Sequence, residues 1–295
     1  MRRQSVRLMA ALFMSVAASG TAAHAHHSFV AQFDGNKPIT LKGPVTKVEW
    51  RNPHIWVYLD ARGPDGTPVP RTADGRADLS GIWNKRLVVN TSASVEPLPF
   101  TPEGLKAFND VWNHIDPTSR CIFPGVPRVN TSPYPMQIVQ LPDKVIFLYE
   151  YMHNYRVIYT DGRTHRPTWE PSLLGDSIGR WDGDTLVIDT VNLTDRTWLD
   201  DHGNRHSDAL RVTERWRRIS ANDLLYEETI EDRQFYTKPW TVRWTIPLAP
   251  KDWVLMEYAC TDNNKDLYDG HLQNGPLNGS LRDGSAIGKP APPRR

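Results

Sequence analysis

Acidic and imidazole side chains gather in the second half of the chain, in one polar loop and on the strand expected after it. The loop contains Asp200 and His206, and the expected strand contains Glu214. Side chains alternate between the two faces of a strand, so Glu214 shares its face with Val212 and Trp216. This alternation predicts a carboxylate that points inward, and such a group needs a partner because its charged form is costly when buried.

Arg156 is a candidate for that partner, because it alternates with its neighbours on an earlier expected strand. A carboxylate in such a setting can have its pKa shifted towards neutrality and act as an acid or a base. His206 would supply the second role in proton transfer, with its ring oriented by Asp200 or Asp208. The alternative is a structural network of ion pairs, or a set of exposed loop charges.

A wider set of polar and aromatic side chains is expected to line a pocket. Aromatic walls with a few polar groups suit a small, partly apolar molecule or a sugar ring. Arg156 or Arg163 would stabilise negative charge that develops in a reaction. Ordinary core packing is the alternative explanation for the aromatic rings. The expected ligand-binding residues are His153, Arg163, His165, Trp181, Trp198, Tyr236 and Trp240.

Two further motifs carry less weight. The stretch Gly175-Asp-Ser-Ile-Gly179 matches G-x-S-x-G. A nucleophile elbow, however, needs a strand before the serine and a helix after it, whereas a turn and a strand are expected here. The stretch from Asp262 to Asp266 resembles a calcium loop, but Leu267 stands where glycine is required and Gln273 where glutamate is required. The sequence thus disfavours both a serine hydrolase of this class and a calcium site.

The amino-terminal segment has the pattern of a secretory signal peptide over residues 1–25. Arginines precede an apolar segment, Leu8–Val16, and Ala23-His-Ala25 forms a small-x-small cleavage site. The segment is too short for a membrane span, so we expect an exported, periplasmic protein that is cleaved at this site. The new terminus would carry His26 and His27, which with His54 could chelate copper or zinc. The alternative is that these terminal histidines are simply mobile.

Composition limits the classes of function. The chain has 295 residues, of which 39% are hydrophobic and 23% charged, enough for one large domain or two smaller ones. A net charge of +1 without a basic block argues against nucleic acid as a partner. The sequence shows neither a phosphate loop nor a dinucleotide fingerprint. Any reaction is therefore expected to need no cofactor, and a small organic molecule is the expected partner.

The sequence contains two cysteines, Cys121 and Cys260, and their state depends on whether the compartment is oxidising or reducing. An oxidising compartment permits a disulfide between them, and the alternative is two separate buried thiols. Their spacing offers no C-x-x-C metal or redox motif.

Two stretches resemble exported bacterial families of unknown function. Ala25-His-His-Ser-Phe29, Leu41-Lys-Gly-Pro-Val45 and Asn52-Pro-His-Ile55 are similar to the opening of a small domain, and this match stops near Asp60. From residue 78 to residue 266 the chain resembles a second, secreted β-rich family. That resemblance implies no activity. Its motifs include Cys121-Ile-Phe-Pro-Gly-Val-Pro-Arg128, Trp181-Asp-Gly-Asp-Thr185, Tyr236-Thr-Lys-Pro-Trp240 and Glu257-Tyr-Ala-Cys260.

The elements that position these residues are expected to be mainly β. Short strands joined by turns favour an antiparallel meander, and closure into a lipocalin-like barrel would remove its edges. A β-sandwich is the alternative. One short helix is expected near 102–115, capped by Thr101 and with Pro102 in its first turn. The expected strands are 136–141, 144–151, 154–159, 185–191, 209–218, 223–232, 240–248 and 253–259.

The expected organisation is a signal peptide at 1–25, a small β segment at 26–62, a linker at 63–77, a main barrel-like domain at 78–267 and a disordered tail at 268–295. The sequence favours an exported protein that binds a small molecule. A further step would be a cofactor-free lyase, hydratase or isomerase reaction that uses histidine and carboxylate groups, and whether the protein is an enzyme at all stays open. The alternative function is periplasmic copper or zinc binding by His26, His27 and His54.

Overall fold

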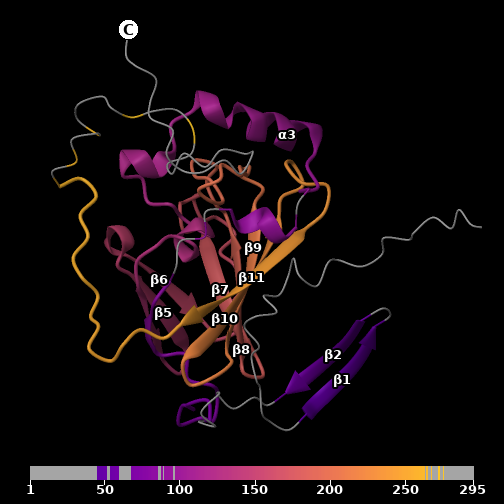
Figure 1. Cartoon of the computed structure of the whole chain (residues 1–295), viewed down its shortest axis with the longest axis vertical. Helices are drawn as coiled ribbons and strands as arrows, with labels where there is room; N and C mark the ends of the chain where they lie inside the picture. Colours follow the sequence, from indigo (N-terminus) through magenta and orange to yellow (C-terminus); the bar gives the residue numbers. More distant parts are fainter. Residues whose placement is uncertain are drawn as a thin grey trace, which may run out of the picture. The chain divides into compact units, whose positions relative to one another are not determined.

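The computed structural model describes residues 45–51, 54–59, 68–85, 88, 90–95, 97–262, 264, 267, 272 and 275. Within them the chain forms a two-stranded hairpin and a nine-stranded sheet, shown in Figure 1. The hairpin consists of β1 (Val45–Arg51) and β2 (His54–Leu59). The sheet consists of β3 (Gly81–Trp83), β4 (Met136–Gln140), β5 (Lys144–Tyr149), β6 (Asn154–Tyr159), β7 (Asp176–Asp182), β8 (Thr185–Val191), β9 (Arg211–Arg218), β10 (Asp223–Glu231) and β11 (Trp240–Pro247).

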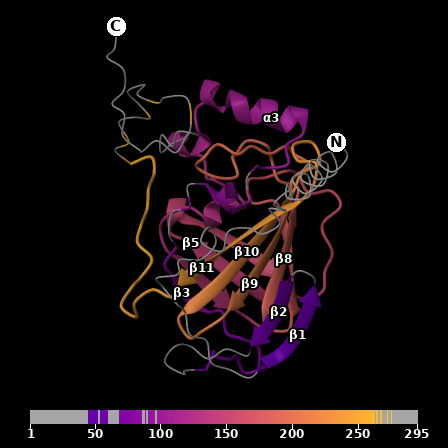
Figure 2. The ribbon, with the colours of Figure 1, turned by 45° about the vertical axis from the view of Figure 1, so that its right-hand side comes forward.

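The nine-stranded sheet curls into a nearly closed barrel, as the sequence predicts. Neighbouring strands follow chain order from β3 to β11, and Figure 2 shows β8 to β11 side by side. The first and last strands then meet: Trp83 bridges to Leu248, and the Ala249 N–H donates to the Ile82 carbonyl at 2.8 Å. Closure in this way satisfies backbone groups that an open sheet would leave unpaired at its edges.

The barrel departs from a pure antiparallel meander at one place. Strands β6 and β7 run parallel, and they share one backbone pair, Tyr159 with Ile178. A parallel pair cannot be joined by a tight hairpin, so residues 160–175 form a longer connection. Residues 154–157 and 174–177 are consequently not paired with each other, and the ring of strands is loosened at this position.

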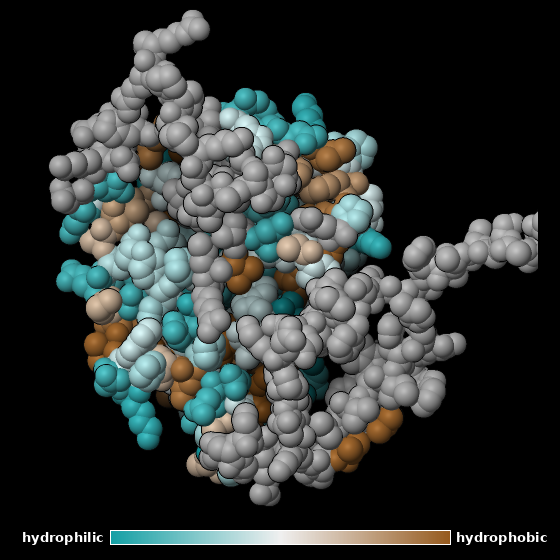
Figure 3. Space-filling model, viewed as in Figure 1, coloured by the Kyte–Doolittle hydropathy of each residue, from teal (hydrophilic) through white to brown (hydrophobic). Residues whose placement is uncertain are grey.

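The barrel interior follows the two-residue period of the strands. On β9 the buried positions include Val212, Glu214 and Trp216, and on β10 they include Tyr226 and Glu228. The interior is therefore a packed core that also contains carboxylates. On the face shown in Figure 3, hydrophilic and hydrophobic residues are interspersed over the surface.

The helix is shorter than the apolar pattern suggests. Helix α3 covers Pro102–Asn109, and a 3-10 turn follows from Asp110 to Asn113. The Thr101 side chain accepts the Gly104 N–H at 3.0 Å, as expected of a cap. Leu105 is 47% exposed, so it does not form part of a buried apolar stripe. The helix instead packs closely at Gly104 against the backbone of Phe235. A Cβ atom at this position would stand 2.1 Å from the Phe235 carbonyl oxygen.

Two strands were not expected from the sequence, and one expected strand is absent. β3 is too short for a periodic signal, and the glycine in β7 weakens the strand pattern there. Residues 253–259 form no strand, because their backbone groups pair with side chains: the Met256 N–H donates to Glu150 Oε2 at 2.9 Å and the Tyr258 N–H to His153 Nε2 at 2.7 Å. Cys260 then forms a disulfide with Cys121, 139 positions earlier.

Residues 68–77, the last two thirds of the expected linker, contact the barrel. Arg71 bonds bidentately to Asp184 at 2.9 and 3.0 Å, and Ala77 is fully buried. The expected signal peptide and most of the expected tail lie outside the described residues. Among the described residues, no helix is long and apolar enough to cross a membrane.

Candidate functional site

The inward carboxylate and its arginine form a buried ion pair. Arg156 Nη2 lies 2.6 Å from Glu214 Oε2, and Nη1 lies 3.2 Å from Oε1. The side chains are 2% and 0% exposed. Arg156 Nη2 also donates to Thr190 Oγ1 at 3.2 Å and to Ser177 Oγ at 3.1 Å. A charge pair this deep is costly unless further hydrogen bonds satisfy its polar groups. Here both Nη atoms of Arg156 are bonded, whereas its Nε is buried without a partner among the described residues.

Glu214 is held from a second side by neutral groups. Asn130 Nδ2 donates to Glu214 Oε1 at 2.7 Å and to the Tyr226 hydroxyl oxygen at 2.9 Å. The Tyr149 hydroxyl donates to Asn130 Oδ1 at 3.1 Å. Burial raises the pKa of Tyr149 to about 12, so the phenol stays protonated. These bonds fix the amide orientation of Asn130, with Glu214 Oε1 as an acceptor.

A second buried carboxylate, Glu228, pairs with Glu214 in the register of β9 and β10. The Tyr226 hydroxyl donates to Glu228 Oε2 at 2.7 Å, whereas Oε1 is buried and has no hydrogen-bond partner among the described residues. Burial, together with the negative charges of Glu214 and Asp200, raises the pKa of Glu228 to about 8. The two carboxyl groups therefore differ: Glu214 forms an ion pair with Arg156, and Glu228 is largely protonated at neutral pH.

Glu228→Gln is expected to flatten the pH dependence of stability. The pKa of Glu228 is about 8 in the folded chain against 4.5 as its ordinary value, so the folded state binds this proton more tightly. The free energy of unfolding of the unmodified protein therefore falls as pH rises through this window, by at most about 1.4 kcal/mol per pH unit. Glutamine cannot ionise, and it keeps an acceptor for Tyr226. Urea unfolding at a series of pH values measures the slope.

Glu227→Gln is the matched control, because Glu227 lies on the outer face of the same strand with its side chain 30% exposed. Its variant should keep the slope of the unmodified protein. An unchanged slope in Glu228→Gln would contradict a buried proton at this position.

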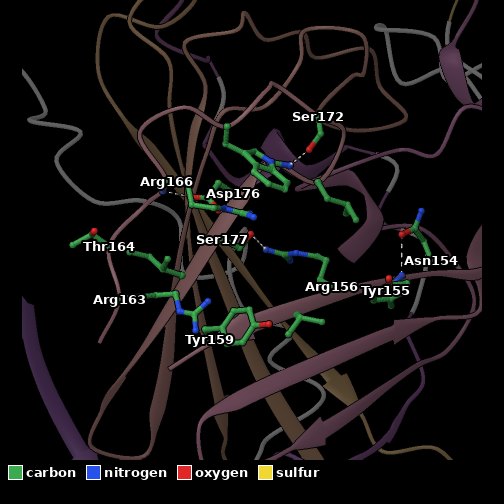
Figure 4. Close-up of a pocket in the computed structure, with 15 residues that line it drawn as sticks. Asn154, Tyr155, Arg156, Tyr159, Arg163, Thr164, Arg166, Ser172, Asp176 and Ser177 are labelled. Atoms are coloured by element: carbon green, nitrogen blue, oxygen red, sulfur yellow. Dashed lines mark hydrogen bonds and ion pairs between the residues drawn. The ribbon is translucent and has the colours of Figure 1, made fainter. Parts of the chain in front are cut away.

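A cleft of about 520 Å³ opens where β6 and β7 separate. In Figure 4 the Arg156 side chain extends towards Ser177, and Arg163 and Arg166 come from the connection between the strands. Arg156 thus belongs to both the buried pair and the cleft wall. The cleft is lined by Asn154, Tyr155, Arg156, Val157, Tyr159, Arg163, Thr164, Arg166, Trp169, Ser172, Leu174, Gly175, Asp176, Ser177 and Ile178.

Two arginines of the cleft stack on aromatic rings. The guanidinium carbon of Arg163 lies 3.5 Å from the centroid of Tyr159, and that of Arg166 lies 3.2 Å from the centroid of Trp169. Both also form ion pairs, Arg163 with Asp161 and Arg166 with Asp176, each with a shortest distance of 2.6 Å. The stacked rings and the ion pairs together fix the planes of the guanidinium groups.

The polar loop is not the mouth of a pocket. Asp200 is fully buried, where its carboxylate accepts hydrogen bonds from the side chains and backbone of Thr91 and Asn204 and from the His202 N–H. His206 meets Thr197 Oγ1 at 3.1 Å and the Ser207 carbonyl at 2.9 Å. None of these residues lines the cleft. Asp200 therefore organises the fold of the loop.

Within the part of the chain that the structure describes, His206 forms no hydrogen bond with Asp200, Asp208, Glu214 or Arg156, so its role in proton transfer stays a prediction. Its ring makes the two contacts above and is 1% exposed. Burial lowers the pKa of His206, which keeps the ring neutral at neutral pH. The loop has no periodic pattern of apolar residues, so the sequence does not indicate which of its side chains are buried.

Of the residues predicted to bind a ligand, Arg163 lines the cleft and the other six do not. His153 accepts the Tyr258 N–H and so anchors the segment before Cys260. His165 lies between Asp176 and Asp189, at 3.0 and 2.9 Å, and braces the connection that borders the cleft.

The aromatic residues of that prediction pack in the fold. Trp198, Tyr236 and Trp240 are at most 5% exposed, and Tyr236 contacts the rings of Phe100 and Trp240. Trp181 packs against the hydrophobic core and beneath Arg76. The alternative explanation, core packing, holds for these four positions.

Several residues of the site were not predicted to have the role that the structure gives them. Glu228 alternates with Tyr226 and Ile230, so the pattern that indicated Glu214 also applies to it. Asn130 and Tyr149 come from other segments and carry no comparable signal. Ser177 lies on β7, where its hydroxyl bonds to Arg156 and Thr190. The strand that continues after Ser177 excludes a nucleophile elbow at this serine.

The metal prediction falls mostly outside the described residues. His26 and His27 are not described, and His54 lies on β2 with a side chain that is not described. Among the described residues, no group of three or more histidine, cysteine, aspartate or glutamate side chains is placed to hold a metal ion.

The comparisons with known proteins concern the amino-terminal part of the chain. Residues 13–73 match the model of a family of unknown function (DUF6152). This match includes the stretch from Ala25 to Ile55 that resembles a small exported domain, and it ends before the barrel begins. Neither the curated proteins nor the solved structures yielded a match.

Proposed function

We propose that this chain is an exported β-barrel protein that binds a small organic molecule in the cleft between β6 and β7. The observation that carries the proposal is the cleft itself. Its volume of about 520 Å³ lies within the range of small-molecule sites, roughly 300–1,000 Å³. Its walls combine apolar side chains with a few polar groups fixed by hydrogen bonds. A barrel opened between two strands gives a ligand access that a closed, packed core would deny.

Export to the periplasm is part of the proposal. The signal-like pattern at 1–25 supports it, and so does the disulfide between Cys121 and Cys260, since disulfides persist in oxidising compartments. The resemblance of residues 78–266 to a secreted β-rich family agrees with this location.

A proton-transfer reaction has weaker support. The unlike environments of Glu214 and Glu228 are those of an acid and a base. Both side chains are fully buried, however, and Arg156 separates Glu214 from the cleft. Binding is accordingly the function that the geometry supports best, and a lyase, hydratase or isomerase activity is the second candidate.

Native mass spectrometry of protein purified from a periplasmic fraction tests the proposal. We expect a retained small molecule, and we expect Val157→Trp to lose it, because Val157 lines the cleft. Ile146→Trp is the matched control: Ile146 pairs with Val157 across β5 and β6, is also half-buried and does not line the cleft. Equal retention by both variants would place the ligand elsewhere, and protein confined to the cytoplasm would refute export.

A further inference from the structure

We infer that the cleft between β6 and β7 selects an organic acid: a molecule with one anionic group and a flat, apolar body. This inference rests on the proposed function, because it specifies the ligand of the same cleft. The side chains that line the cleft include three arginines, Arg156, Arg163 and Arg166, and one carboxylate, Asp176. No other described residue of the lining carries a formal charge at neutral pH.

The carboxylate of Asp176 is already occupied. It accepts hydrogen bonds from the backbone and guanidinium of Arg166 and meets the ring of His165. Its negative charge is therefore compensated by Arg166 and His165 and does not attract a cationic ligand. The same contacts hold the connection from 160 to 175 beside the cleft.

The arginines keep donors for an anion despite their ion pairs. Arg166 uses Nε and Nη2 on Asp176, and its Nη1 makes no hydrogen bond within the part of the chain that the structure describes. On the cleft wall, Arg156 is 2% exposed, and its Nε is buried with no acceptor in the described ranges of the chain. A guanidinium that stacks on a ring still presents the N–H groups of its edge, which match the two oxygens of a carboxylate or phosphate.

The size and walls of the cleft favour an organic anion over an inorganic one. A free phosphate or sulfate would fill a small part of about 520 Å³. The rest is bordered by Val157, Leu174 and Ile178 together with the rings of Tyr155 and Trp169. These surfaces gain by contact with a flat hydrocarbon body, while the guanidinium groups take its anionic end.

Isothermal titration with three matched probes tests the inference: 1-naphthoate, 1-naphthyl phosphate and the neutral 1-naphthamide. We expect at least one of the two acids to bind about tenfold more tightly than the amide, since a hydrogen bond to a charged group is worth roughly that factor. Arg166→Met and Arg163→Met should each weaken the acid by a similar factor. Arg180→Met, an exposed arginine of β7 outside the cleft, should leave affinity unchanged. Arg163 is exposed, and its ion pair with nearby Asp161 and its stacking on Tyr159 are both local contacts, so its variant keeps the test valid if Arg166→Met fails to fold.

The outcomes separate this inference from the proposed function. Tight binding of an acid that Val157→Trp abolishes supports both. Equal binding of the acids and the amide, lost in Val157→Trp, would keep the cleft as a ligand site and overturn its preference for acids. Failure of all three probes to bind would overturn the inference, and the retained-ligand experiment then decides the proposed function by itself. The preference between the carboxylate and the phosphate identifies which anionic group the cleft accepts.

Discussion

Arg156→Met is expected to lower the free energy of unfolding by about 3–5 kcal/mol. The substitution removes the cation from Glu214, which is fully buried and 2.6 Å from Arg156. The cost arises because an unpaired charge inside the barrel has lost both water and its partner. Urea unfolding at neutral pH measures the loss as a lower midpoint of the transition.

The double variant Arg156→Met with Glu214→Gln should recover much of this loss. A neutral amide carries no charge to be compensated, and it still accepts the hydrogen bond that Asn130 donates at 2.7 Å. Recovery in the double variant would show that the cost of Arg156→Met lies in the isolated charge and not in lost packing.

Arg215→Met is the matched control for the buried arginine. Arg215 is adjacent to Glu214 on β9 but faces outward, 38% exposed, and pairs with Asp182 at 2.9 Å. An exposed pair of this kind contributes at most about 1 kcal/mol. A loss in Arg156→Met no larger than in Arg215→Met would contradict the structural role of the buried pair.

Replacing Cys121 and Cys260 together with alanine is expected to cost about 5 kcal/mol of stability. The bond joins residues 139 positions apart, and in the chain-entropy model a closed loop of this length removes that much freedom from the unfolded state. The measurement is urea unfolding of the oxidised protein beside the double variant, and the absence of thiols that react in denaturant confirms the bond.

Hydrogen exchange shows which part of the chain becomes less stable when the disulfide is removed. In the double variant the N–H groups of Met256 and Tyr258 should exchange faster. Their hydrogen bonds to Glu150 and His153 would no longer be held in place by the nearby disulfide. A loss below about 1 kcal/mol would show that residues 249–260 leave the barrel before it unfolds, in which case the long loop adds little to global stability.

The alternation of residue types is enough to predict which side chains face inward along the strands. Alternation is a local property of an extended backbone and does not depend on how the strands pair. It therefore predicts that Glu214 and Arg156 point into the interior. The same argument applies to Glu228. The succession of short strands also favoured closure into a barrel, because unpaired edges are costly.

Which of these residues contact one another depends on the packing of distant segments. Alternation fixes the face of a strand, but it does not fix the register between strands or the path of a loop, so neither the alignment of Glu214 with Glu228 nor the contacts of His206 followed from it. The cleft likewise exists because β6 and β7 pair in parallel through one residue pair, with residues 160–175 passing between them. That arrangement depends on contacts between distant parts of the chain, and a local pattern of residues contains no record of such contacts.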